Sequence, residues 1–192
     1  MFFDHKSPSP PPPDLANLKV TDARLGDVLS VTGAGPDFSD LDFTIDRLDQ
    51  LEAGSRRWVE LSGPWRERRL YLEVHSSEIQ TGGTVEVFGN FDGRRLTLDQ
   101  IGLSEQDLAD LDARQNPNDF LDYEGKFWLY RFSREMGIFS NGKATGTGFY
   151  AWQFQEQEGR RFMNLRKYQG EPFTAVIYTR TEPADITVYR GA

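Results

Sequence analysis

Two histidines, His5 and His75, are the side chains of this sequence best suited to proton transfer near neutral pH. His5 stands beside the proline-rich stretch "SPSPPPP" at 7–13, which predicts an extended arm with no catalytic role. His75 follows the strand pattern "LYLEV", and the sequence has no G-x-S-x-G motif to supply a serine nucleophile. We therefore expect His75 to be a solvent-facing residue at a strand end, with proton transfer as the less favoured alternative.

A metal site could be built from His75 with Glu73 and Glu78, because imidazole and carboxylate groups bind divalent cations. The absence of cysteine excludes a disulfide framework, a cysteine-bound zinc, an iron–sulfur cluster and a thiol nucleophile. The acidic stretch at 37–49 lacks the glycine that a calcium loop needs, so it predicts a solvated face. The sequence predicts no metal, no cofactor and no catalytic residue, and hence a protein that is not an enzyme.

Aromatic side chains are concentrated in the second half of the chain, where strands are apolar on both faces. Either these rings pack against the first half, or one aromatic face is a docking surface for a partner. A barrel with an internal pocket is a further possibility, in which an arginine orients an anionic group. The candidates for ligand or partner binding are Trp128, Tyr150, Trp152 and Phe154, together with Arg131 and Arg166.

Short apolar runs broken by turn residues predict a mainly β protein from Leu25 onward. We expect two related antiparallel β lobes, each a sandwich or partly open barrel, joined by one short α-helix. The predicted organisation is a disordered arm at 1–17, a first lobe at 18–100, a helical connector at 101–118 and an aromatic-rich second lobe at 119–192, with the lobes packed as one unit.

Several local predictions support this organisation. "LDFTIDRLDQLE" at 41–52 predicts one strand, and "VEVFGNFDGRRLTL" at 85–98 predicts a hairpin that turns at Asp92-Gly93. Ser104 is a good helix N-cap, and Asp107 stands at the position that completes a capping box. In "KFWLYRFS" at 126–133, strict alternation places Trp128, Tyr130 and Phe132 on one face.

Two stretches, "WVELSGPWRERRLYLEV" at 58–74 and "WQFQEQEGRRFMNLRKY" at 152–168, follow a similar pattern. Each begins with tryptophan, passes a glycine turn and continues through a double arginine. This similarity favours either a duplicated β unit, whose tryptophan fills the space between sheets, or convergent hairpin chemistry.

The net charge of −8 and the pI near 4.8 oppose attraction to nucleic acid or to anionic lipid. The first ten residues lack the apolar core of a signal peptide, and no later stretch is apolar enough for a membrane span. We therefore expect a cytoplasmic protein that binds no nucleic acid and does not insert into membranes.

The stretches "FWLYRFSREMG", "WQFQEQEGRRFMNLRKYQGEPFTAVIYTR" and "PADITVY", with "RRWVELS" and "RRLYLEV" before them, form an ordered set over residues 20–190. In this order the chain resembles the bacterial family called domain of unknown function 4178. The resemblance implies a cytoplasmic accessory protein that acts beside membrane-stress proteins of the phage-shock type. It assigns no functional residue.

From these observations we expect a non-enzymatic cytoplasmic adaptor, which binds a protein partner, in a membrane-stress assembly if the resemblance holds. The alternative is a β-barrel that binds a small ligand in an aromatic pocket. An adaptor should expose a contiguous apolar patch, whereas a ligand-binding barrel should contain a cavity.

Overall fold

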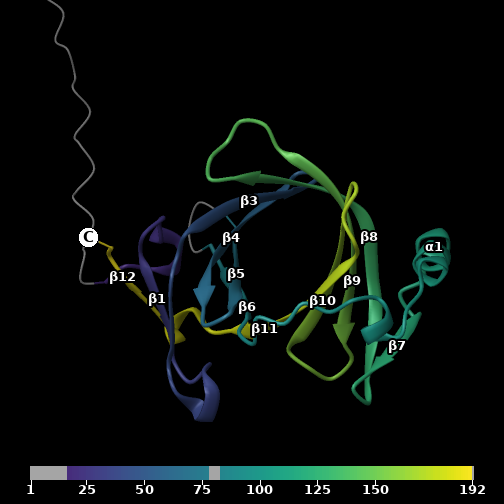
Figure 1. The fold of residues 1–192 in the computed structure, drawn as a ribbon, viewed down its shortest axis with the longest axis horizontal. Helices are drawn as coiled ribbons and strands as arrows, with labels where there is room; N and C mark the ends of the chain where they lie inside the picture. The colour runs from purple at the N-terminus through teal and green to yellow at the C-terminus, as the bar shows by residue number, and fades with distance from the viewer. Residues whose placement is uncertain (1–16, 78–82, 192) are drawn as a thin grey trace, which may run out of the picture.

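The computed structural model describes residues 17–77 and 83–191, and over these ranges the protein is mainly β with one α-helix. The proline-rich arm, including His5, lies outside the described residues, as does Glu78. The described strands form a closed eight-stranded barrel and a separate three-stranded sheet (Figure 1). The expected fold class is therefore confirmed.

The barrel contains strands from both halves of the chain. Its order is β3 (Arg47–Ala53), β4 (Arg56–Trp65), β5 (Arg68–Ser76), β6 (Val85–Asn90), β11 (Thr174–Thr181), β10 (Arg161–Tyr168), β9 (Thr147–Glu156) and β8 (Lys126–Ser140). Pairing of β3 with β8 closes the sheet, so that neither strand is left as an open edge there. The two halves thus share one continuous sheet.

A three-stranded sheet covers one outer side of the barrel. It consists of β12 (Ile186–Tyr189), β1 (Val28–Val31) and β2 (Leu41–Thr44), and its apolar face packs on outward-facing residues of β4 and β5, among them Leu61, Leu70 and Leu72. The single strand expected over 41–52 is wrong. The chain leaves one sheet for the other at Ile45-Asp46, because Leu41 and Phe43 pair with β1 whereas Leu48 and Leu51 pair with β4.

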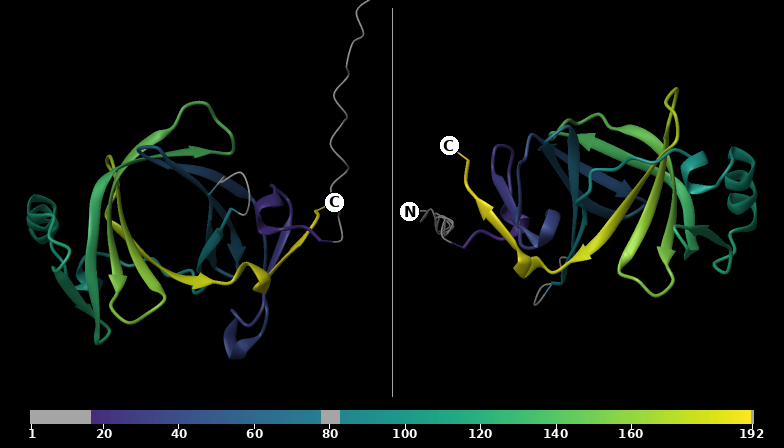
Figure 2. Two further views of the ribbon diagram at one scale, coloured as in Figure 1. Left: turned by 180° about the vertical axis from the view of Figure 1, so that it is seen from behind. Right: turned by 60° about the horizontal axis from the view of Figure 1, so that its bottom comes forward.

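Helix α1 (Glu105–Arg114) covers a different outer side of the barrel, as the two views in Figure 2 show. The side chain of Ser104 accepts a hydrogen bond from the backbone N–H of Asp107, and the Asp107 carboxylate accepts one from the Ser104 backbone. This confirms the predicted capping box. Leu108 and Leu111 of α1 pack with Trp128, Trp152 and other rings of the second half.

A β-bulge interrupts β8 between Tyr130 and Phe132. Before the bulge, Trp128 and Tyr130 face outward toward α1 and its neighbours; after it, Phe132 and Met136 stand on the inner face of the barrel. The expected alternation, which placed Phe132 with Trp128, is therefore wrong. One extra residue reverses the side-chain direction, because strand periodicity is two.

The hairpin expected at Asp92-Gly93 is also wrong. After β6 the chain continues to β11, where Leu96 forms an isolated bridge with Ala175. The strands that pair with β6 are β5 and β11, not the residues that follow Asp92-Gly93. The segment continues into η3 (Asp99–Ile101). Beyond α1 follows strand β7 (Phe120–Tyr123), which pairs antiparallel with the first residues of β8. The other short helices are η1 (Val20–Asp22), η2 (Pro36–Phe38) and η4 (Pro183–Asp185).

The two tryptophans of the repeated pattern face opposite sides of the barrel wall. Trp58 packs inside with Leu51 and Met136, whereas Trp152 lies outside, where its indole Nε1 donates to the carbonyl of Leu108, 3.3 Å away. The similar sequences therefore do not produce equivalent packing.

Candidate functional site

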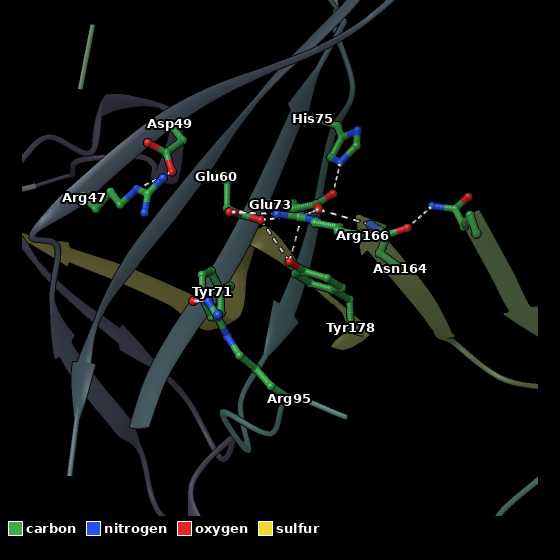
Figure 3. A network of polar contacts seen from close by, with 11 residues as sticks. Arg47, Asp49, Glu60, Tyr71, Glu73, His75, Arg95, Asn164, Arg166 and Tyr178 are labelled. Carbon is green, nitrogen blue, oxygen red and sulfur yellow. Dashed lines mark hydrogen bonds and ion pairs between the residues drawn. The ribbon is translucent and has the colours of Figure 1, made fainter. Parts of the chain in front are cut away.

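A network of charged and polar side chains crosses the inside of the barrel (Figure 3). Arg166 of β10 donates through Nη2 to Glu60 Oε2 at 2.7 Å, to Glu73 Oε1 at 3.0 Å and to the hydroxyl of Tyr178 at 3.1 Å. Tyr178 in turn donates to Glu60 Oε2 at 2.9 Å. All four residues are at least nine-tenths buried, and their strands place them on the inner face by alternation.

Mutual pairing keeps this network charged. Burial by itself would raise the pKa of Glu60, but the adjacent Arg166 guanidinium and the hydrogen bonds from Arg166 and Tyr178 outweigh it and lower that pKa. Burial likewise disfavours the charged form of Arg166, yet Glu60, Tyr178 and Glu73 hold its pKa well above the usual value. Burial also raises the pKa of the Tyr178 hydroxyl, so that it remains a hydrogen-bond donor.

The network extends from Glu73 toward one end of the barrel. His75 Nε2 lies 3.0 Å from Glu73 Oε2, and Asn164 Nδ2 donates to Glu73 Oε1 at 3.4 Å. Gln153 Nε2 donates to Asn164 Oδ1 at 3.1 Å. The geometry fits donation from Nε2 of His75 to the Glu73 carboxylate, which leaves Nδ1 to accept a hydrogen bond.

An aromatic series runs beside the network. The Trp58 ring stacks on the His75 ring with centroids 5.0 Å apart, and His75 meets Phe88 edge-on at 5.4 Å. Phe88 contacts Phe162, which stacks on Tyr178 at 5.0 Å. The series therefore links the barrel end near Trp58 with the buried charges. The expected position of His75 at a strand end is confirmed, because it stands next to the last residue of β5 and its side chain is 35% exposed, but the same ring also contacts Glu73 and Trp58 inside the barrel end.

A cavity of about 880 Å³ opens at this end of the barrel. Its inner part is formed by Glu73, His75, Gln153 and Asn164, so the polar network is its floor. Its walls include Trp58, Phe132, Ala53 and Met136, and its rim carries arginine and hydroxyl groups: Arg56, Arg57, Arg134, Ser55, Ser76, Ser77 and Thr84. A cavity of this size accommodates a drug-sized molecule, since such sites span about 300–1,000 Å³.

A second hollow, of about 760 Å³, lies over the outer face of β6 and β11. Trp65, Phe91 and Ile177 contribute apolar surface, and Arg94 and Glu124 form an ion pair at 3.4 Å on its margin. None of the residues of the buried network lines this hollow, so no preorganised polar floor lies beneath it. The cavity at the barrel end is therefore the better candidate site.

The structure divides the residues predicted to bind a ligand or partner. Trp128, Trp152 and Phe154 are buried in the outer cluster beneath α1, and the half-buried Tyr150 packs at its edge, where its hydroxyl donates to Asp112 at 2.7 Å. Arg166 lies inside the barrel, where two glutamates already pair with it. Arg131 is exposed at the bulge and does not line the cavity. None of the predicted aromatic rings lines the cavity at the barrel end.

Sequence reasoning did not single out Glu60, Tyr178, Trp58 or Arg134 as site residues. A signal was present in "WVELS" and "LYLEV", where an acid stands between apolar residues at strand periodicity. In a sheet with one solvated face, such acids point to water, whereas in a closed barrel they point inward. The alternation of acidic and apolar side chains could be recognised in the sequence. The closure of the barrel, which decides whether the acidic side chains face water or the interior, could not.

The metal site considered from the sequence is not formed by the described residues, which contain no group of three or more histidine, aspartate or glutamate side chains placed to hold a metal ion. Glu73 is instead paired with Arg166 and His75. Helix α1, at ten residues, is the longest helix of the described ranges, and none of the helices there could cross a bilayer.

Comparison of the chain with protein-family models, with curated proteins and with solved structures found no match in any of the three.

Proposed function

We propose that this protein binds a small molecule in the end of its β-barrel, with the ligand seated above the Glu73–His75 pair. The observation that carries the proposal is the cavity of about 880 Å³, whose floor is an ordered polar network and whose walls are partly apolar. Binding sites commonly combine an apolar lining with a few well-placed polar groups.

The floor is organised before any ligand arrives. Glu73 is held by Arg166 and Asn164, and it orients the His75 ring through Nε2. Stacking on Trp58 restricts the same ring from its other side. Little ordering of these side chains would be needed on binding, and preorganisation of this kind raises affinity because fewer rotamers are lost.

The adaptor role expected from the sequence has weaker support. It needs the aromatic rings of the second half at the surface, and Trp128, Trp152 and Phe154 are buried. The exposed large apolar side chains of the described residues belong to separate elements: Leu25, Phe38, Phe120, Phe127 and Tyr189. The rings of Phe120 and Phe127 contact each other edge-on, with centroids 5.2 Å apart. They form a single pair and not an extended apolar patch.

The test is a fluorescence titration with N-phenylnaphthylamine, a neutral apolar probe that brightens when it leaves water. We expect saturable binding of one probe per chain in the wild-type protein. Met136→Trp and Ala53→Trp fill the cavity from neighbouring strands and should each abolish that binding. Circular dichroism and thermal unfolding establish that the variants fold.

Phe127→Trp is the matched control, since it adds an indole at an exposed position on β8 outside the cavity. It should bind the probe as the wild-type protein does. The proposal is contradicted if the wild-type protein binds neither this probe nor a sulfonated analogue of it saturably, or if binding is unchanged in folded Met136→Trp.

A further inference from the structure

Some of the charged side chains around the cavity at the barrel end form ion pairs, and others do not. Arg57 forms an ion pair with Glu52 at 2.8 Å, and Glu86 pairs with Arg180 at 3.2 Å. Glu73 is paired with Arg166 and His75.

Arg56 and Arg134, by contrast, have no carboxylate within ion-pairing distance among residues 17–77 and 83–191, although both line the cavity. In a chain with a net charge of −8, two guanidinium groups at one cavity that have no acidic partner within the described ranges mark it as a place for an anion.

The bulge in β8 is what brings Arg134 to this place. Arg134 pairs with Ala151, and Ala151 is buried on the inner face of the barrel with Phe149 and Met136. Without the extra residue at the bulge, the even-numbered positions after Tyr130 would face outward as Trp128 and Tyr130 do. Bulges of this kind commonly re-aim side chains next to functional sites.

Arg134 is also held in position by an aromatic ring. Its guanidinium carbon lies 3.9 Å from the centroid of Phe132, which lines the same cavity. Stacking leaves the edge of the guanidinium plane, with its N–H groups, free to donate to an anion. Arginine in such an arrangement matches the two oxygens of a carboxylate or a similar oxyanion.

The remaining walls define the rest of the ligand. Trp58, Phe132, Met136 and Ala53 provide an apolar body for the cavity, and His75 and Gln153 provide polar contacts at its floor. A fully hydrophilic anion would leave these apolar walls against water. A molecule with an apolar, ring-containing body and one anionic group would cover the apolar walls and also pair with the arginines.

We infer that the ligand of this cavity is an amphipathic organic anion, with its apolar body between Trp58 and Met136 and its carboxylate, sulfonate or phosphate on Arg134, with Arg56 beside it. This inference rests on the proposed function, because it requires the barrel end to bind a small molecule. Of the two arginines that the sequence offered for an anion, Arg166 is already paired with Glu60 and Glu73 and Arg131 does not line the cavity, so neither takes part.

The experiment compares two probes that differ in one group. Anilinonaphthalene sulfonate has the same aromatic skeleton as N-phenylnaphthylamine and carries in addition a sulfonate. We expect the wild-type protein to bind the sulfonate probe at least about tenfold more tightly, which is the effect of one charge-assisted hydrogen-bonded pair. Arg134→Gln should reduce the ratio of the two affinities to about one, and Arg134→Lys should retain part of it.

Arg131→Gln is the matched control, because Arg131 stands on the same strand at the bulge, is exposed and does not line the cavity. It should leave the ratio of affinities unchanged. If both probes bind the wild-type protein equally, or if Arg131→Gln lowers the ratio as much as Arg134→Gln, the anionic ligand class is overturned while the binding function stands. If neither probe binds, the proposed function itself fails.

Should Arg134→Gln not fold, Arg56→Gln provides the second variant, since Arg56 is exposed on the rim and its side chain is not part of the barrel core. It should lower the preference for the sulfonate probe by a smaller factor. An undiminished preference for the sulfonate probe in Arg56→Gln would show that the rim guanidinium does not contact the anion and would overturn the inference.

Discussion

Glu60 of β4 and Arg166 of β10 meet across the inside of the barrel, with Oε2 and Nη2 2.7 Å apart, although three strands separate β4 from β10 in the sheet. The contact is therefore made through the lumen and not along the wall. It joins the two halves of the chain, and together with Glu73 and Tyr178 it forms the floor on which the candidate site is built.

Removing Arg166 should strongly destabilise the fold. Arg166→Met leaves Glu60 and Glu73 buried without a cation, and breaking a buried ion pair in this way costs about 3–5 kcal/mol. Chemical denaturation monitored by tryptophan fluorescence measures the loss. The control is Arg180→Met, which removes the exposed pair with Glu86 and should cost about 0–1 kcal/mol. Equal losses in the two variants would contradict a stabilising role for the internal network.

Acid should weaken the protein partly through Glu60. Because the folded-state pKa of Glu60 is lowered from its ordinary value of 4.5, ionised Glu60 stabilises the fold at neutral pH. That contribution is complete above the ordinary pKa and is lost as the pH falls through the folded-state pKa. Between about pH 5 and pH 3, the free energy of unfolding should therefore fall more steeply in the wild type than in Glu60→Gln. Parallel pH profiles would show that Glu60 is not held ionised by Arg166.

Trp152 should act as a core residue beneath α1. It is 8% exposed and packs with the outer cluster, so Trp152→Ala should destabilise the protein by about 3–5 kcal/mol. Trp152→Phe keeps most of the packing but loses the hydrogen bond to Leu108, and should cost about 0.5–1.5 kcal/mol beyond the change in size. Thermal unfolding measures both losses, and amide exchange in α1 reports whether the helix loosens. Near-wild-type stability of Trp152→Ala would make this residue a surface anchor instead.

Gly63 should tolerate no side chain. A Cβ at this position would clash with the carbonyl oxygen of Thr44 and lie 2.9 Å from the Phe43 ring, because β2 crosses closely over β4 there. We expect Gly63→Ala to destabilise the protein by about 1–3 kcal/mol, measured by chemical denaturation. Gly148, a strand glycine with open space around its Cα, is the control: Gly148→Ala should be neutral or slightly stabilising. A neutral Gly63→Ala would mean that the three-stranded sheet can move away from the barrel.

Local features of the fold were predictable because they depend on neighbouring residues. The capping box involves Ser104 and Asp107, which lie within four consecutive residues, so it can be recognised from the local sequence. The mainly β class follows from the short apolar runs. The bulge at Arg131 and the sheet exchange at Ile45-Asp46 were not predicted, since neither leaves a clear mark on the pattern of hydrophobic residues. Each depends on which strand the next residues pair with.

The residues predicted from the sequence to bind a ligand are not the ones that line the cavity at the barrel end. Arg166 or Arg131 was expected to orient an anion. In the structure Arg166 is paired with Glu60 and Glu73, and Arg131 does not line the cavity. Arg134 lines it and has no acidic partner among the residues that the structure describes. The sequence alone determined a mainly β chain with a capped helix and strands that carry acids among apolar residues. The tertiary structure decided that β3 pairs with β8 and closes the barrel. That long-range pairing converts the polar face of each strand from a solvated surface into a buried interior, because a side chain's environment depends on what encloses it.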